Sequence, residues 1–299
     1  MPPRRPEADA RRRTHAERLR SRDGYFPPES VIRRVGNSPL TPFLGGGPAV
    51  LLQVAHPLVA AGVVAHSDYR QQLWRRLQRT LQALYLITYG TRAEADRVGE
   101  VVAAVHEHVR GTIPARLGRY PAGTPYSADD PDLMLWVHAT LVECSLAVYT
   151  RFVEPLSAGE QEEYHGQMRT VGRVFGVPES VLPRSLAEFR EYFRAEADGA
   201  SIAVTEPARS VAEVILAPHL PPPMRLFGPA HRMASAGLMP PRLRGEYGLR
   251  WSRAHELALP VAARGMRLAA VPVVRATAYL ETSRIPVLAE HMLCQHAAK

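Results

Sequence analysis

Twelve histidines give this 299-residue sequence its chemical interest, and four of them fall in segments with helical periodicity. A neutral imidazole binds Fe, Zn, Cu or Ni through one ring nitrogen while the other nitrogen donates to a nearby acceptor. A buried histidine on a helix is therefore the residue type that a metal or metallocofactor site needs, although most helical histidines only bond backbone or solvent. The four candidates are His56, His66, His106 and His138.

The candidates differ in what their surroundings indicate. At 100° per residue, His106 and His108 fall on opposite flanks of one apolar stripe, so periodicity cannot choose between them. His138 has apolar neighbours on all sides, which favours a core histidine bonded to backbone. His56 precedes Pro57, where a proline inside a helix frees a carbonyl group that a side chain or cofactor can satisfy. The stripe beside His106 consists of Val98, Val101, Val102, Val105 and Val109.

Arginine and threonine interrupt a second apolar stripe, in the segment from Ser67 to Tyr89. Arg76 and Thr80 fall on its inward face, and Arg79 is adjacent to Thr80. An arginine rarely faces a core without an anionic or polar partner. The partner is a carboxylate in a structural salt bridge, the acid group of a cofactor, or an oxygen species on a metal. The sequence pattern leaves these three alternatives open.

Several common catalytic sites are excluded by their motifs. A ferritin-like di-iron site needs two ExxH motifs, and only Glu162 to His165 is present, in a polar stretch that predicts a solvated helix face. HExxH, GxSxG, the P-loop and the phosphate-binding GxGxxG are absent. Three glycines, Gly45 to Gly47, precede Pro48 and predict a plain turn more strongly than an anion cradle.

Helix signals position these residues in an all-α fold. Pro48 suits the first turn of a helix, and Asp130 followed by Pro131 combines a cap with a proline at the first helical position. The helix after Pro131 is apolar nearly all round and is predicted to be buried. Three pairs have capping-box spacing, namely Thr91 with Glu94, Ser157 with Glu160, and Ser185 with Glu188. At least six helices and no convincing strand predict one large helical domain.

Composition sets the boundaries of that domain. Many of the arginines behind the net charge of +8 lie in residues 1–22, which predicts a disordered basic tail and no nucleic-acid partner. We expect the helical domain over 23–280 and a second tail over 281–299. The arginines at the start are not followed by an apolar signal region, and no uninterrupted apolar window appears long enough to cross a bilayer. With only Cys144 and Cys294, far apart, a disulfide scaffold is excluded, and we expect a cytoplasmic protein.

Taken in order, several segments resemble the DUF2236 family, which includes the MpaB oxygenase and the latex clearing proteins. They are GGGPAVLLQVAHPLVAAGVVAHSDY, RLQRT, VHEHVRG, PYSADDPDLMLWVHATL and YGLRWS, and the similarity extends from about residue 30 to 275. The resemblance implies a helical protein that binds haem b in a pocket between helices. It also implies the use of dioxygen, or peroxide, to cleave carbon–carbon double bonds of a hydrophobic small molecule. Because CxxCH is absent, the haem would be held non-covalently.

The resemblance also assigns residues. His106 of HEHVRG matches the proximal haem ligand, which resolves the tie with His108. Arg76, Arg79 and Thr80 match the distal segment that reads Arg-x-x-Lys-Thr in the latex clearing proteins. Here Arg79 replaces the lysine, and a guanidinium stays protonated and cannot bind iron. We therefore expect an open or water-bound sixth position.

Three histidines remain without a definite role, because His56, His66 and His138 either line the haem pocket or only bond backbone. Two other functions are compatible with the same residues. One is a haem protein without catalysis, such as a sensor or carrier. The other is a helical binding protein without haem.

Overall fold

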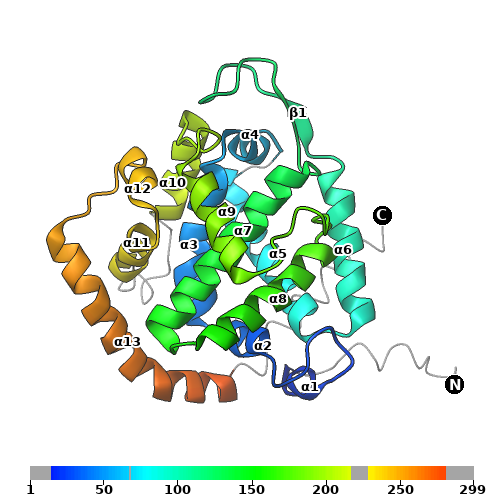
Figure 1. Cartoon of the computed structure of the whole chain (residues 1–299), viewed down its shortest axis with the longest axis vertical. Coiled ribbons are helices and arrows are strands. Elements are labelled where there is room, and N and C mark those ends of the chain that lie inside the picture. The colour runs from blue at the N-terminus through cyan, green and yellow to red at the C-terminus, as the bar shows by residue number, and fades with distance from the viewer. Residues whose placement is uncertain (1–14, 67–68, 217–227, 281–299) are drawn as a thin grey trace, which may run out of the picture.

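The computed structural model describes residues 15–66, 69–216 and 228–280, which form one mainly helical domain (Figure 1). The all-α prediction is confirmed. The elements are α1 (His15–Arg20), α2 (Val31–Gly36), α3 (Leu40–Val54), α4 (Pro57–His66), α5 (Tyr69–Tyr89), α6 (Arg92–His106), β1 (Arg110–Thr112), β2 (Pro125–Ser127), α7 (Pro131–Val148), η3 (Tyr149–Val153), α8 (Ala158–Val174), α9 (Leu186–Asp198), α10 (Glu206–Leu216), α11 (Gly228–Gly237), α12 (Pro241–Glu246) and α13 (Arg253–Leu280).

Helices α3 and α7 pack against each other at the centre, and the other helices surround them (Figure 1). Trp136 of α7 is fully buried, stacks on Phe193 of α9, and donates its indole N–H to the carbonyl of Leu52 in α3 at 3.0 Å. The predicted burial of the apolar helix after Pro131 is therefore confirmed. An aromatic ring of this size, hydrogen-bonded at its polar edge, fixes three helices to one another.

No transmembrane segment was predicted from the sequence, and that prediction stays open, because a test of length and composition alone leaves one helical segment as a candidate. Pro131–Val153 passes that test, but 61% of its apolar window is buried inside the fold. Helices α3 and α4 pass together only as a pair bent by 104°. Both segments lie in the core of the domain, where apolar helices of this length are also common.

Pro48 does not begin a helix, because α3 starts at Leu40 and contains all three glycines. Gly47 serves close helix packing rather than a turn, whereas a Cβ at Gly45 would meet its neighbours at ordinary contact distances. A Cβ at Gly45 would lie 3.5 Å from the backbone oxygen of Cys144 in α7, and one at Gly47 would lie 2.6 Å from the ring of His231 in α11. Sequence spacing alone does not distinguish a glycine that permits close packing from one that makes a turn.

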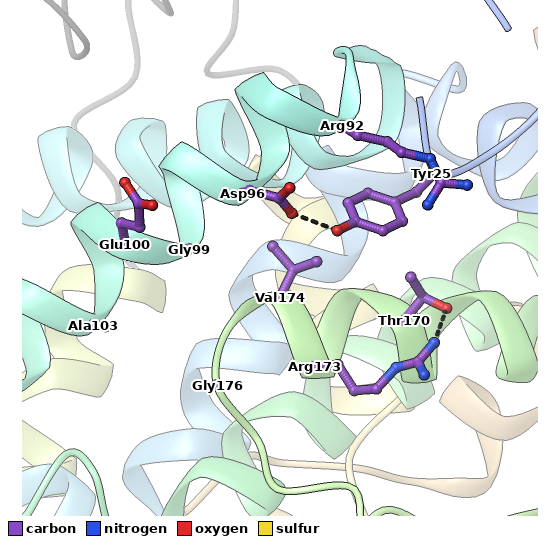
Figure 2. A pocket seen from close by; sticks show the side chains of 10 residues that line it. All are labelled: Tyr25, Arg92, Asp96, Gly99, Glu100, Ala103, Thr170, Arg173, Val174 and Gly176. Atoms are coloured by element: carbon purple, nitrogen blue, oxygen red, sulfur yellow. Dashed lines mark hydrogen bonds between the residues drawn. The ribbon is translucent and has the colours of Figure 1, made fainter. Parts of the chain in front are cut away.

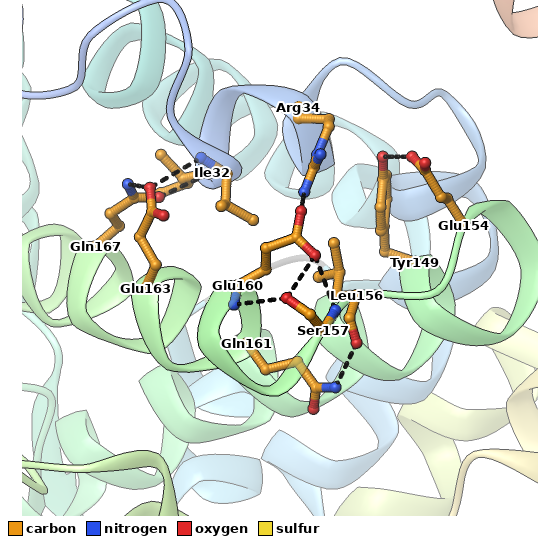
Figure 3. Close-up of polar contacts among 11 residues, drawn as sticks. Ile32, Arg34, Tyr149, Glu154, Leu156, Ser157, Glu160, Gln161, Glu163 and Gln167 are labelled. Carbon is orange, nitrogen blue, oxygen red and sulfur yellow. Dashed lines mark hydrogen bonds and ion pairs between the residues drawn. The ribbon is translucent and has the colours of Figure 1, made fainter.

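The helix caps agree closely with the sequence signals. Thr91 and Glu94, and likewise Ser157 and Glu160, form complete capping boxes. Asp130 accepts from the N–H groups of the first turn of α7, with Pro131 at its start. Ser185 caps α9, although Glu188 accepts from the N–H of Arg184 instead of from its own cap residue. Figure 3 shows that Glu160 also pairs with Arg34, which joins the start of α8 to α2.

The basic tail was predicted to extend to residue 22, but residues 15–20 form the helix α1. Arg18 is only 4% exposed and donates both terminal nitrogens to Glu94, at 2.9 and 3.1 Å. Burial of the arginine is tolerated because its charge is paired. Residues 1–14 and 281–299 lie outside the described residues, so the rest of the two tail predictions stays open.

Two short strands form the only sheet in the described ranges. β1 pairs antiparallel with β2, with Gly111 opposite Tyr126, and this hairpin comes directly after α6. The hairpin and its connecting segment lie above the end of α4 (Figure 1). It therefore joins the helix that carries His106 to the helix that carries His66.

Candidate functional site

The candidate site lies at the open end of the hairpin that α5 and α6 form. The two helices are joined at Gly90 and Thr91 and pack against each other. At a rise of 1.5 Å per residue, Arg76 lies about 21 Å before Gly90 along α5, and His106 lies about 24 Å after it along α6. The α5–α6 hairpin therefore brings Arg76, in the predicted distal segment, and His106, the predicted proximal histidine, to similar distances from the turn at Gly90.

The surroundings of His106 and His108 differ, although their sequence context does not separate them. His108 is exposed and its Nδ1 lies 2.8 Å from the carbonyl oxygen of Ala104. His106 is the last residue of α6, is half-buried, and has an Nδ1 atom that is shielded from solvent. With Nδ1 shielded, a ligand reaches the ring of His106 through Nε2.

The valine stripe beside His106 becomes progressively exposed toward the end of α6. Val98 is buried, Val101 and Val102 are half-buried, and Val105 is 50% exposed. Large aliphatic side chains with that much exposure are few in the described part of the chain. An apolar surface that continues past the protein's own packing, next to a histidine, suits a large apolar ligand.

The β1–β2 hairpin and the residues that precede it hold the chain in place directly after His106. The carbonyl of His106 accepts from the N–H of Val109 at 2.9 Å, and Val109 packs close to Gly62 of α4. Tyr126 of β2 lies against the same part of α4, and its hydroxyl group is 3.2 Å from Nε2 of His66. His66 is thus tied to the segment after His106, at the exposed end of α4. Tyr126 was not predicted, although it lies in the segment PYSADDP that carries the family resemblance.

Gly111 has no room for a side chain. A Cβ there would lie 2.7 Å from the hydroxyl oxygen of Tyr126 and 2.9 Å from the adjoining ring carbon. Gly111→Ala should displace the tyrosine ring, break its contact with His66, and lower the free energy of unfolding by about 1–3 kcal/mol, as overpacking does. Urea unfolding measures the change. Gly159→Ala is the matched control, because nothing lies within 4 Å of its added methyl group, and an unchanged Gly111→Ala protein would contradict the contact.

His56 lies at the other end of α4 and has both ring nitrogens engaged. Nδ1 accepts from the N–H of Leu58 at 3.2 Å, so Nε2 carries the proton and donates to the hydroxyl of Tyr120 at 3.2 Å. Burial lowers the pKa of His56 to about 4. The imidazole caps the first turn of α4 where Pro57 breaks the chain away from α3. These contacts explain His56 without a ligand, and a pocket role for it stays a prediction.

His138 is buried in the core, where α7 packs against α8. A Cβ added to Gly172 of α8 would lie 3.1 Å from Nε2 of His138, so the ring packs directly against the α8 backbone. Burial, together with the nearby His165, lowers the pKa of His138 to about 4. The predicted bond from His138 to backbone is absent at Nδ1, which has no partner among the described residues. His165 was predicted on a solvated face but is 2% exposed and packs against Phe189. The prediction was wrong because the acidic residues around His165 indicated a solvated helix face. The periodicity placed its neighbour Tyr164, and not His165, on the inward face.

The distal segment differs from the sequence-based prediction in one respect. Thr80 and Arg79 are both exposed on α5, so Thr80 does not face the core. The stripe that defined the inward face of the segment mixes apolar and polar positions. In the second half of α5, Leu86 and Ile87 are buried. Arg76 lies in α5, but its side chain is outside what the structure describes.

A pocket of about 820 Å³ with a mixed polar and apolar lining opens between α6 and α8 (Figure 2). Its α6 side is formed by the face that includes Asp96, Gly99 and Ala103, and His106 lies on the same face one turn later. Tyr25 donates to Asp96 at the far end, and the guanidinium of Arg92 lies over the tyrosine ring, 4.9 Å from its centroid. Sequence periodicity did not find this pocket, because it forms between segments that are far apart in the chain.

The described residues form a helical domain in which the half-buried His106 follows the exposed Val105 at the end of α6. Residues 33–270 match the family described as "ER-bound oxygenase mpaB/B'/Rubber oxygenase, catalytic domain". The chain therefore belongs to this family of oxygenase catalytic domains, and the resemblance inferred from the sequence is confirmed.

Similar proteins are known from mycobacteria. The chain is 29% identical over 214 residues to an uncharacterized protein of Mycobacterium bovis, Mb2261, and equally to one of Mycobacterium tuberculosis, Rv2237. Each match covers 69% of this chain and 80% of the relative. No solved structure matches significantly. Neither relative carries an assigned activity, so a functional assignment depends on the family match and on the geometry of the site.

Proposed function

We propose that this protein is a haem b-dependent oxygenase that holds the iron through Nε2 of His106 and oxidises a hydrophobic small molecule with dioxygen or peroxide. The observation that carries the proposal is the uncovered apolar end of α6 around His106. There the exposed Val105 lies next to a half-buried imidazole whose Nδ1 is shielded. Membership of an oxygenase family supports the same class of reaction.

The residues at the open end of the α5–α6 hairpin fit a non-covalent haem. Val102 and Val105 offer aliphatic contact for a flat apolar ring, and His106 offers a nitrogen ligand on the same helix. The hairpin β1–β2 holds the chain directly after His106 and so limits movement of the ligand. A bound haem would supply the site at which the oxidant is activated. Cys thiolate ligation is not needed, since Cys144 is buried far along α7.

In this proposal Arg76 and Arg79 contribute positive charge, and Thr80 contributes a hydroxyl group. Arg76 reaches the level of His106 along the α5–α6 hairpin, and Arg79 lies one turn later with an exposed side chain. Either guanidinium can pair with a propionate carboxylate through two parallel N–H···O bonds. The hydroxyl of Thr80 can donate to the oxidant only if α5 presents it to the site. Neither arginine could bind iron itself, because a guanidinium stays protonated, so their proposed role is to pair with an acid group.

A hydrophobic substrate agrees with the aliphatic character of the α6 surface, and oxidative cleavage of a carbon–carbon double bond is the reaction that we propose. The test is to express the full chain with haem supply and to record the absorption spectrum and haem stoichiometry by the pyridine haemochrome assay. Oxygen consumption with an isoprenoid alkene then measures turnover. A haem-loaded protein without turnover would be a sensor or carrier, and absence of a Soret band would reject haem binding altogether.

A further inference from the structure

Helix α13 is apolar on two opposite faces, and the described residues cover only one of them. The inner face packs Leu259, Ala263 and Met266 against Leu44 and Phe152 in a separate hydrophobic cluster. The outer stripe of α13 consists of Leu257, Val261 and Leu268, whose exposed fractions are 75%, 73% and 75%. The spacing of four and seven residues places the three side chains on one line along the helix. Figure 1 shows α13 at the rim of the molecule.

The charges around the outer stripe have one sign. Arg264 falls between Val261 and Leu268 on the same line, and Arg253 and Arg250 lie exposed at its start. The sequence from residue 257 to 280 contains three arginines and no acidic residue. Glu256 accepts from the indole of Trp251 and lies near Arg244, so its charge is directed toward α12. The outer side of α13 is therefore both apolar and cationic.

Arg267 shows that not every arginine of α13 contributes to this surface. Its guanidinium donates to the carbonyl oxygens of Thr150 and Arg151 at the end of η3, at 2.6 and 2.7 Å. These bonds fasten α13 to the body of the domain. Arg264, three residues earlier, is exposed and has no ion pair within the described ranges. The helix is thus held by one arginine while another is left for an external partner.

We propose that the outer stripe of α13 docks on the surface of a bilayer that contains anionic lipid. An amphipathic helix with aliphatic residues on one line and arginines beside them lies in the headgroup region, where the side chains enter the acyl boundary and the guanidinium groups reach phosphates. This docking goes beyond the proposed oxygenase activity and does not depend on haem. It would bring a hydrophobic substrate dissolved in the bilayer close to the enzyme.

A second copy of the chain fits the outer stripe less well. Three aliphatic side chains on one helix face offer much less than the about 800 Å² per partner that a standard protein interface buries. Two copies paired through this face would also bring together surfaces that are both positively charged, which disfavours association. An anionic lipid surface satisfies the apolar stripe and the arginines at once, because its charge is complementary.

Sedimentation of the full-length protein with lipid vesicles tests the docking. We expect binding to vesicles of phosphatidylcholine with phosphatidylglycerol and little binding to phosphatidylcholine alone, since each basic residue near the surface adds attraction. The double variant Leu257→Ser, Leu268→Ser should bind at least about tenfold more weakly, because two aliphatic contacts are lost. Arg264→Gln should weaken binding several-fold and reduce its dependence on salt.

Arg116→Gln is the matched control, because Arg116 is an exposed arginine in the segment between β1 and β2, at the opposite end of the molecule from α13 (Figure 1). It removes the same charge and should leave vesicle binding unchanged. Equal binding by the serine double variant and the unchanged protein would overturn the proposal. So would a dimer in solution that the double variant converts to monomer without any vesicle binding, since the stripe would then be an interface between copies. Haem content, measured in parallel, reports separately on the proposed function.

Discussion

His106→Ala should abolish stoichiometric haem binding and remove nearly the whole Soret band of the protein expressed with haem supply. The variant loses the imidazole that follows Val105 at the end of α6, and in the proposal this imidazole is the protein ligand of the haem iron. The side chain is half-buried at the end of its helix. Replacing it by alanine should therefore leave the fold intact, with an unchanged helical circular-dichroism signal.

His108→Ala is the matched control for this experiment. His108 lies two residues away and is exposed, with Nδ1 close to the carbonyl oxygen of Ala104. Haem content should stay near one per chain in His108→Ala. If His106→Ala kept a full complement of haem and His108→Ala lost it, the ligand assignment would be reversed. Retention by both variants would place the ligand elsewhere, and His66 would then be the first residue to examine because of its position at the end of α4.

Local signals in the sequence predicted most helix starts correctly. Thr91, Asp130 and Ser157 each cap the helix that their spacing predicted, because a cap depends on backbone groups within three residues of the cap itself. Burial of α7 was equally predictable, since a helix that is apolar all round has no face for water. These features depend on a few neighbouring residues, and a sequence displays all of them.

Features that depend on distant segments were predicted poorly. The glycines of α3 were interpreted as a turn because nothing nearby in the sequence shows that α7 and α11 approach them. His165 was predicted to be solvated because Phe189, which covers it, lies on another helix. The choice of His106 over His108 came from the family resemblance. The structure adds an independent reason, the difference in exposure, which depends on where α6 ends and the hairpin begins.

Arg79 and Thr80 illustrate the same limit on the distal side. The inward position of Thr80 was inferred from a stripe that contains only scattered apolar residues, but its side chain is exposed, as is that of the adjacent Arg79. Periodicity identifies a helix face, but the packing partner determines which face is covered. Position along the α5–α6 hairpin is more robust, because it depends on helix rise alone. That argument still brings Arg76 level with His106.

Acid should destabilise the fold well above the pH at which carboxylates titrate, because burial lowers the pKa of three histidines, His56, His138 and His165, and favours their neutral form. Burial lowers the pKa of His56 and of His138 to about 4, against 6.5 for an unfolded chain. Below 6.5 the unfolded chain binds a proton at each site that the folded chain does not, so stability falls as the pH falls and the loss is complete near pH 4. His56 and His138 should each cost about 2 kcal/mol between about pH 7 and about pH 5.

Urea unfolding across that pH range measures the effect, and His138→Met separates the contribution of His138. Methionine has a similar volume and no titratable group, so the variant should lose about 2 kcal/mol of the pH-dependent change while it keeps the core filled. His108→Gln removes an exposed histidine and should leave the slope unchanged. The lowered pKa of the Glu94 carboxyl, paired with Arg18, acts only below its ordinary value of 4.5 and does not contribute in this window. An undiminished slope in His138→Met would show that His138 gains a proton-accepting contact in the folded protein, and its neutral burial against Gly172 would be wrong.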